Sequence, residues 1–124
     1  MRTCELRHLA LEHEYGPCGG KLNRHHIVSK GNLTKNKAGR YLVDKTYKFD
    51  EEEEPYPGMF LAWVCSHHDD QTRFAHTPVA RDFLLQKRYN AYGQRFLDAV
   101  EELALTCTSP LDYLRPYLEM IDET

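Results

Sequence analysis

The chain has 124 residues, a net charge of −3 and a mean hydropathy of −0.66. This length fits one domain with a modest core, and the slightly acidic balance argues against a uniformly basic protein that coats nucleic acid. No apolar run approaches the roughly 18 residues of a membrane helix, and the N-terminus does not read as a signal peptide. We therefore expect a cytoplasmic protein that does not insert into membranes. In that reducing compartment, four cysteines and seven histidines favour metal binding over disulfides.

The N-terminal segment contains two cysteines and a histidine pair. Two glycines follow Cys18 and allow the tight turn of a zinc knuckle, in which backbone amides point at a thiolate. Residues 6–14 fit either a strand or a short helix, because their periodicity does not distinguish the two. Residues 21–28 predict a strand that carries His25 and His26, whose side chains should point to opposite faces.

Basic and acidic residues are segregated along the chain. Residues 21–48 contain eight lysines and arginines against one acidic residue, whereas residues 50–54 are all acidic. A basic segment around paired histidines is the pattern expected for binding to a phosphate backbone. A solvated loop whose lysines maintain solubility explains the same charges equally well. The candidate contacts to a phosphate backbone are Lys21, Arg24, Lys30, Lys35 and Lys37.

The middle of the chain predicts a strand followed by helix starts. Residues 59–64 are the most apolar stretch and predict a strand that ends at Cys65. Ser66, with Asp69 three residues later, predicts a capping box that opens a short helix towards residue 75. Thr77, followed directly by a proline, predicts the start of the next helix.

The C-terminal part predicts helices only. Helical spacing of apolar residues predicts one long helix or two pieces divided at Gly93. Ser109 and Pro110 open a terminal helix that Pro116 kinks or restarts. These helices can also carry a homodimer or protein-partner surface, although aromatic residues at helical spacing favour core packing. The apolar positions are Val79, Phe83, Leu84, Tyr89, Tyr92, Phe96, Leu97, Val100, Leu103 and Ala104.

Four residues offer the ligand set of a structural zinc ion, which takes cysteine and histidine in tetrahedral geometry. The alternative is a cluster of reduced, apolar cysteines. The separation between the first two cysteines is wider than in a usual knuckle, and Cys107 is left outside the set as a core or surface residue. The predicted zinc ligands are Cys4, Cys18, Cys65 and His68.

Such a zinc ion would bring the histidine pair close to His67 and Asp69. A histidine and an aspartate can hold a divalent ion against a scissile phosphate. A second histidine, free of metal, can accept a proton from water, because its reference pKa of ~6.5 lies near working pH. The alternative is that the pair makes hydrogen bonds to the zinc ligands.

The succession Cys18-Gly19, His25-His26-Ile27 and Cys65-x-x-His68-Asp69 resembles the HNH endonucleases, which are ββα-metal relatives of the treble-clef zinc fold. The resemblance covers residues 4–76. It implies an α+β protein with a zinc-stabilised ββα-metal core at residues 1–76. A helical extension at residues 77–124 would pack on this core to form a single compact domain.

The resemblance also implies an activity and a role for each matched residue. The protein would be a DNA endonuclease with structural Zn²⁺ and a catalytic Mg²⁺, Mn²⁺ or other divalent ion. His25 and Asp69 would bind the catalytic ion, His26 would be the general base, and His67 or His76 would be the alternative ligand. Small proteins of this type are common in bacteriophages and prophages, and a chain of this size fits that setting. If it is phage encoded, the protein would act in the host cytoplasm.

Two positions depart from the family pattern. The asparagine that orients the base in the family is replaced by Phe60, and Asn32, Asn36 or a backbone carbonyl could take over its role. Asp69 replaces the family's final histidine, which is chemically tolerable because a carboxylate binds hard metals well. The competing interpretation is therefore a catalytically inactive, zinc-stabilised module that binds nucleic acid or protein.

Overall fold

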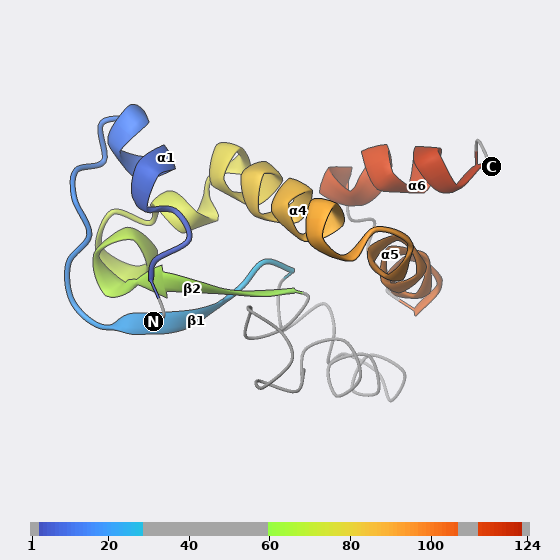
Figure 1. Ribbon diagram of the computed structural model, residues 1–124, viewed down its shortest axis with the longest axis horizontal. Coiled ribbons are helices and arrows are strands. Elements are labelled where there is room, and N and C mark those ends of the chain that lie inside the picture. Colours follow the sequence, from blue (N-terminus) through green and yellow to red (C-terminus); the bar gives the residue numbers. More distant parts are fainter. Residues whose placement is uncertain (1–2, 29–59, 107–111, 123–124) are drawn as a thin grey trace.

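The computed structural model describes residues 3–28, 60–106 and 112–122 and shows a mixed helix-and-sheet fold. In Figure 1, α1 (Arg7–Glu12) lies above a two-stranded sheet. The helix α4 (Pro78–Tyr92) leads from the region above this sheet to α5 (Gln94–Thr106) and α6 (Arg115–Asp122). The prediction of a protein that combines helices with a small sheet is confirmed. None of the helices in these ranges has both the length and the apolar character that a membrane crossing requires.

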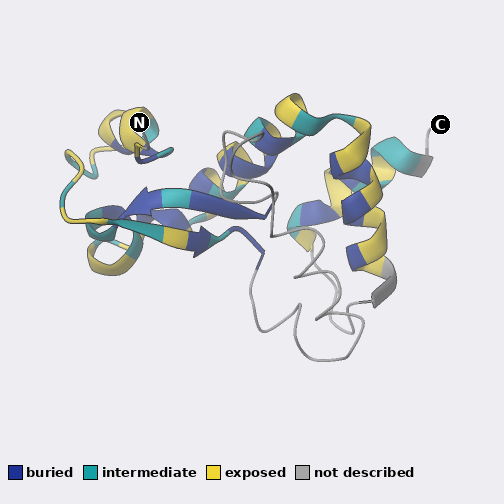
Figure 2. Cartoon of the chain, turned by 60° about the horizontal axis from the view of Figure 1, so that its bottom comes forward, coloured by how far each residue is buried: buried dark blue, intermediate teal, exposed yellow. Residues whose placement is uncertain are grey.

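The sheet pairs β1 (Leu22–His26) with β2 (Leu61–Cys65) in antiparallel orientation, and both strands match their predicted positions. Leu22 lies opposite Cys65, and His26 lies opposite Leu61. In Figure 2, β2 is buried along most of its length, whereas β1 carries intermediate and exposed residues. The histidine pair therefore lies on the more accessible of the two strands.

The chain after β2 makes two short turns instead of the predicted helix. The first is a π-helical turn, η2 (His67–Gln71), and the second is a 3-10 turn, η3 (Phe74–His76). The predicted capping box is wrong, because Ser66 has helical angles and its hydroxyl donates to the carbonyl of Gly19 at 3.3 Å. The run is interrupted at Arg73, whose φ of 59° lies in the left-handed region and ends the helical path.

The helix starts and breaks further along agree with the sequence. The hydroxyl oxygen of Thr77 accepts a hydrogen bond from the amide of Ala80 at 3.3 Å, and Pro78 is the first residue of α4. Gly93, with a φ of 57°, ends α4, so the long apolar pattern forms two helices. A 3-10 turn, η4 (Asp112–Leu114), precedes α6, which starts one residue before Pro116. The predicted start at residues 109–110 lies outside the described residues.

One hydrophobic cluster joins the sheet to the helices. The rings of Phe60 and Phe96 lie 5.9 Å apart within it, and Phe96 lies 5.0 Å from Tyr117 on α6. Two residues expected in the core are exposed instead, Val79 at 45% and Phe83 at 39%. The reason is that α4 buries the face formed by Ala80, Leu84, Leu85 and Arg88, which leaves Val79 and Phe83 on its flank. Ala104 on α5 is also exposed.

Candidate metal centres

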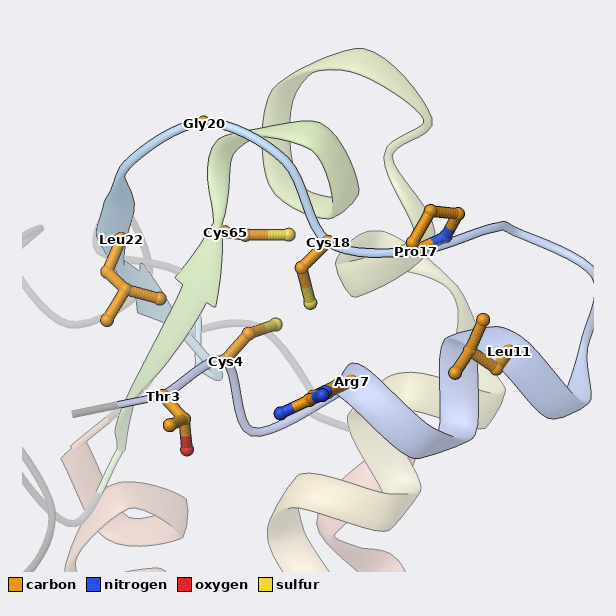
Figure 3. A pocket seen from close by; sticks show the side chains of 9 residues that line it. All are labelled: Thr3, Cys4, Arg7, Leu11, Pro17, Cys18, Gly20, Leu22 and Cys65. Carbon is orange, nitrogen blue, oxygen red and sulfur yellow. The ribbon is translucent and has the colours of Figure 1, made fainter. Parts of the chain in front are cut away.

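A cluster of three cysteines and one histidine joins four separate segments of the chain. Cys4 precedes α1, Cys18 lies in the loop before β1, Cys65 ends β2, and His68 lies in η2. One ligand atom from each residue lies within 4.8 Å of the other three. In Figure 3 the three sulfur atoms point towards a common position. These four residues can hold a metal ion, and they are the four that the sequence predicts.

The distances within this cluster agree with tetrahedral coordination. Ligands of a zinc ion with bonds of 2.3 Å to sulfur and 2.0 Å to nitrogen would place these atoms about 3.5 Å apart. His68 Nδ1 lies 3.2 Å from the sulfur of Cys65 and 3.9 Å from that of Cys18. The other ring nitrogen of His68 lies 3.0 Å from the carbonyl oxygen of Gly16. A backbone carbonyl in this position holds a histidine ligand in one orientation and one tautomer.

Cys4 reaches the cluster because its neighbour Glu5 pairs with β2. The amide of Glu5 donates to the carbonyl of Trp63 at 2.8 Å, and the amide of Trp63 donates to the Glu5 carboxylate at 2.8 Å. This pairing aligns the N-terminal segment beside β2, with Cys4 at the end where Cys65 lies. The residues that follow form the helix α1, whereas the sequence was compatible with either a strand or a helix in this segment. The wide spacing between Cys4 and Cys18 is therefore bridged by a helix and a loop.

The loop that carries Cys18 packs directly on the start of η2. The amide of His67 donates to the carbonyl of Gly19 at 3.1 Å. Gly20 has a φ of +78°, and a Cβ at this position would lie 1.8 Å from the hydroxyl oxygen of Ser66. Only glycine fits both the backbone angle and the space. Gly20 therefore allows the Cys18 loop to approach the end of β2.

The thiols show why this cluster suits a cation. Burial by itself would raise the pKa of Cys65. Hydrogen bonds from the backbone of Gly19 and His68 and from the other two thiols together have a larger, opposite effect, so the pKa of Cys65 lies below its ordinary value. Burial and the charge of Cys4 raise the pKa of Cys18 to about 12. Thiolates this close repel one another, so a bound cation is needed before all three can be ionised. The donor set of three sulfurs and one imidazole is that of a structural zinc site.

A second group of possible ligands lies on the β1 side of η2 and consists of His25, Asp69 and His76. Asp69 Oδ1 lies 3.1 Å from His25 Nδ1 and 3.2 Å from His76 Nε2. Two ligands at right angles on an ion with bonds of 2.1 Å are about 3 Å apart, so these separations suit a shared divalent ion. The sequence predicts His25 and Asp69 as the ligands of this ion and offers His76 only as an alternative ligand.

Asn23 orients the carboxylate of Asp69 and was missed in the sequence. Its side-chain amide donates to Asp69 Oδ2 at 3.2 Å and to Asp70 Oδ2 at 3.0 Å. Asn23 and His25 are two residues apart on β1 and so share one face of the strand. With Oδ2 held by Asn23, Oδ1 of Asp69 faces the two histidines. The period-two spacing of Asn23 and His25 was the available signal.

The four histidines near this site have different surroundings. Burial lowers the pKa of His25, with Asp69 opposing the effect, so its ring is neutral near pH 7, which is the form that binds metals. His26 is the next residue on β1 and is partly exposed, whereas His25 is buried. His67 Nδ1 lies 3.0 Å from Gln71 Oε1, and His67 is not part of either ligand group. Of the two histidines expected as alternative ligands, His76 is therefore the one that lies in the group.

The remaining predicted site residues are divided between described and undescribed parts of the chain. Lys21 and Arg24 are exposed, and the Arg24 guanidinium lies 5.4 Å from the centre of the Trp63 ring. Lys30, Lys35 and Lys37 lie outside the described residues, as do the two asparagines considered as substitutes for the family asparagine. Phe60 is fully buried against Phe96, so it belongs to the core.

Comparison with known proteins gives no relative for this chain: it matches no family model, no curated protein and no solved structure.

Proposed function

We propose that this protein is a metal-dependent DNA endonuclease whose catalytic ion is held by His25, Asp69 and His76. The observation that carries the proposal is the convergence of these three side chains beside a separate group of three cysteines and a histidine. One group has the donors of a structural zinc site, and the other has mixed nitrogen and oxygen donors that leave positions for substrate oxygens. The resemblance of the histidine pair and the Cys-x-x-His-Asp run to HNH endonucleases supports the same assignment.

The donor set also indicates which ions the second site favours. Two imidazoles and one carboxylate suit manganese, iron, cobalt, nickel or zinc better than magnesium, which prefers oxygen ligands. An ion at this site would supply positive charge against the phosphate of the scissile bond. Asn23 and the buried position of His25 hold the ligands in place before the ion binds.

His26 is proposed as the general base, and the basic residues of β1 and the loop before it as DNA contacts. His26 ends β1 and is partly exposed, so a water molecule can reach it. Lys21 and Arg24 are exposed along the same segment and would contact the phosphate backbone, which gives affinity without sequence preference.

The decisive experiment is nicking of supercoiled plasmid DNA by the zinc-loaded protein, with manganese, nickel or magnesium added separately. We expect cleavage with manganese or nickel to exceed that with magnesium. The variant His26→Ala should lose cleavage and keep its binding of the second ion, measured by calorimetry. The variant His76→Ala should lose both, with metal affinity reduced about tenfold or more.

The matched control is His13→Ala, which removes an exposed histidine that lies in neither ligand group. This variant should cleave as the wild type does. Equal nicking by the wild type and His26→Ala at matched purity would exclude His26 as the base. Full metal affinity in His76→Ala would exclude the three-residue site.

A second candidate function is favoured by Phe60. This residue occupies the position of the family asparagine and is fully buried in the core, so it cannot orient a base. The same fold without catalysis would be a zinc-stabilised module that binds nucleic acid or protein. One tightly bound zinc ion, together with no cleavage of any DNA or RNA form under any added ion, would favour this function over the endonuclease.

A further inference from the structure

The cluster of cysteines is open to solvent through a pocket of about 390 Å³. Figure 3 shows this pocket, with Cys4, Cys18 and Cys65 on one side and Arg7 and Leu11 of α1 on the other. His68, the fourth residue of the cluster, is fully buried and does not line the pocket. The sulfur side of the centre is therefore accessible to a small molecule, and the imidazole side is covered by protein.

The three thiols are unequally accessible from this pocket. Cys4 is 7% exposed and Cys65 is 2% exposed, whereas Cys18 is an exposed residue. A molecule that enters the pocket would thus meet the sulfur of Cys18 first. The sulfur of Cys4 lies within 4.8 Å of it, close enough to react next with little movement.

The pocket also has a charge preference. Among the described residues that line it, Arg7 is the one with a charged side chain. Arg7 is exposed and extends from the start of α1 towards Cys4 (Figure 3). A guanidinium beside the thiols attracts an anionic reagent.

We propose that this pocket is a thiol-modification site, at which a small anionic disulfide exchanges with Cys18 and thereby dismantles the Cys/His cluster. This inference does not depend on the endonuclease activity, because it concerns the four cluster residues and the pocket above them. Oxidising surroundings would therefore break up the metal centre and remove its contribution to the stability of the fold.

The exchange proceeds in two balanced steps. In the metal-loaded cluster the sulfur of Cys18 is a thiolate. It attacks one sulfur of the disulfide, a bond forms between them, and the other half leaves as a thiolate. The Cys4 thiolate then attacks the sulfur of Cys18, forms the Cys4–Cys18 disulfide and releases the second half as a thiolate. Two protein thiolates have been oxidised, the reagent has been reduced to two thiolates, and the cluster retains one sulfur and one imidazole donor.

The test compares two disulfide reagents of different charge on the zinc-loaded protein. One is the dianionic bis(nitrobenzoate) disulfide, and the other is the neutral dipyridyl disulfide. All variants carry Cys107→Ser, so that this remaining thiol does not contribute. Zinc release is followed with a chromogenic chelator, and the modified cysteine is identified by peptide mass mapping.

We expect the first adduct to form on Cys18, and we expect zinc to be released at the rate at which this adduct forms. Replacing Arg7 by glutamine should lower the ratio of the anionic to the neutral rate about fivefold at low ionic strength. Arg115→Gln, which removes an exposed charge on α6, is the matched control and should leave that ratio unchanged. Cys18→His replaces the exposed sulfur donor by a nitrogen donor, so this variant should still bind zinc and should resist both reagents.

A first adduct on Cys4 or Cys65 would overturn the proposal. An unchanged ratio in Arg7→Gln would overturn the preference for an anion. If Cys18→His does not bind zinc, the mass mapping and the Arg7 comparison in the otherwise unaltered cluster still decide the question.

Discussion

Arg88 donates two hydrogen bonds to the carboxylate of Glu5, one from Nη1 at 2.6 Å and one from Nη2 at 2.9 Å. The Arg88 side chain is completely buried, and that of Glu5 is 6% exposed. The guanidinium also donates to the carbonyl of Leu61, so α4, β2 and the N-terminal segment meet at one arginine. Since Glu5 follows Cys4, this ion pair helps to place the first ligand of the cysteine cluster.

Removing one partner of this pair should destabilise the protein strongly. Arg88→Met leaves the buried Glu5 carboxylate without its buried guanidinium partner and with only the more exposed ammonium of Lys87 near it. We expect the free energy of unfolding to fall by about 3 to 5 kcal/mol. Urea denaturation of the zinc-loaded protein measures this change. The double variant Glu5→Gln with Arg88→Met should recover part of the loss, because no unpaired charge remains.

The neighbouring Lys87 provides the control for this prediction. Its ammonium lies 3.4 Å from the same Glu5 carboxylate, but its side chain is 34% exposed. Lys87→Met should therefore cost less than about 1 kcal/mol. Similar losses for Lys87→Met and Arg88→Met would show that burial of the pair does not determine its contribution.

The contact between Gly20 and Ser66 predicts a second large effect. Gly20→Ala introduces a Cβ 1.8 Å from the hydroxyl oxygen of Ser66, at a backbone φ of +78°. We expect a loss of about 1 to 3 kcal/mol from the backbone angle alone, together with weaker zinc binding. Gly19→Ala is the matched control, because its Cβ would meet its nearest neighbour at an ordinary 3.5 Å.

A third variant separates the two causes. Gly20→Ala combined with Ser66→Gly removes the clash and keeps the strained angle, so it should recover only part of the zinc affinity. Competition with a chromogenic chelator measures that affinity. If Gly19→Ala and Gly20→Ala bind zinc equally well, the close approach of the two segments does not support the metal centre.

Local chemistry explains which features were predictable from the sequence. The strand that carries His25 and the strand that ends at Cys65 follow from apolar spacing and β-branched residues over a few positions. The four residues of the Cys/His cluster follow from the scarcity of side chains that bind a soft cation. Thr77 and Gly93 mark the start and end of α4 because a cap and a breaker act within one turn.

The features that the sequence did not reveal depend on distant partners. Arg88 interrupts an apolar face and reads as a solvent-facing residue, and only Glu5, 83 residues earlier in the chain, makes its burial favourable. His76, which the sequence offered only as an alternative ligand, joins Asp69 after the left-handed turn at Arg73, and no local pattern indicates that turn. Ser66 has the sequence of a cap, yet its hydroxyl bonds to Gly19 in the other segment.

Tyr117 predicts a stability change at high pH. Burial, with the charges of Asp82 and Tyr89, raises the pKa of Tyr117 to about 12 in the folded protein. The phenol of an unfolded chain ionises near pH 10, so between about pH 10 and 12 the unfolded state binds fewer protons. The free energy of unfolding should therefore fall as the pH rises through this window, by about 1 to 3 kcal/mol.

Denaturation of the wild type and Tyr117→Phe at several pH values from 9 to 12 tests this dependence. The difference between the two proteins should be constant below about pH 10 and change above it. Tyr15→Phe removes a phenol that packs on Phe74, far along the chain from α6, and serves as the control. A pH profile for Tyr117→Phe that parallels the wild type throughout would contradict the raised pKa.

Replacing Asn23 should weaken the second metal site although Asn23 is not one of its ligands. Asn23→Leu removes the donor to Asp69 Oδ2 and leaves the carboxylates of Asp69 and Asp70 without the amide that they share. Because Asp69 can then rotate, the affinity for manganese should fall about 10- to 100-fold. The Cys/His cluster should keep its zinc, since the hydrogen bonds of the Asn23 amide go to Asp69 and Asp70, which are not members of that cluster. Calorimetric titration of the zinc-loaded protein measures the manganese affinity, with Asn90→Leu on the exposed side of α4 as the control. An unchanged manganese affinity in Asn23→Leu would mean that His25 and His76 fix the orientation of Asp69 by themselves.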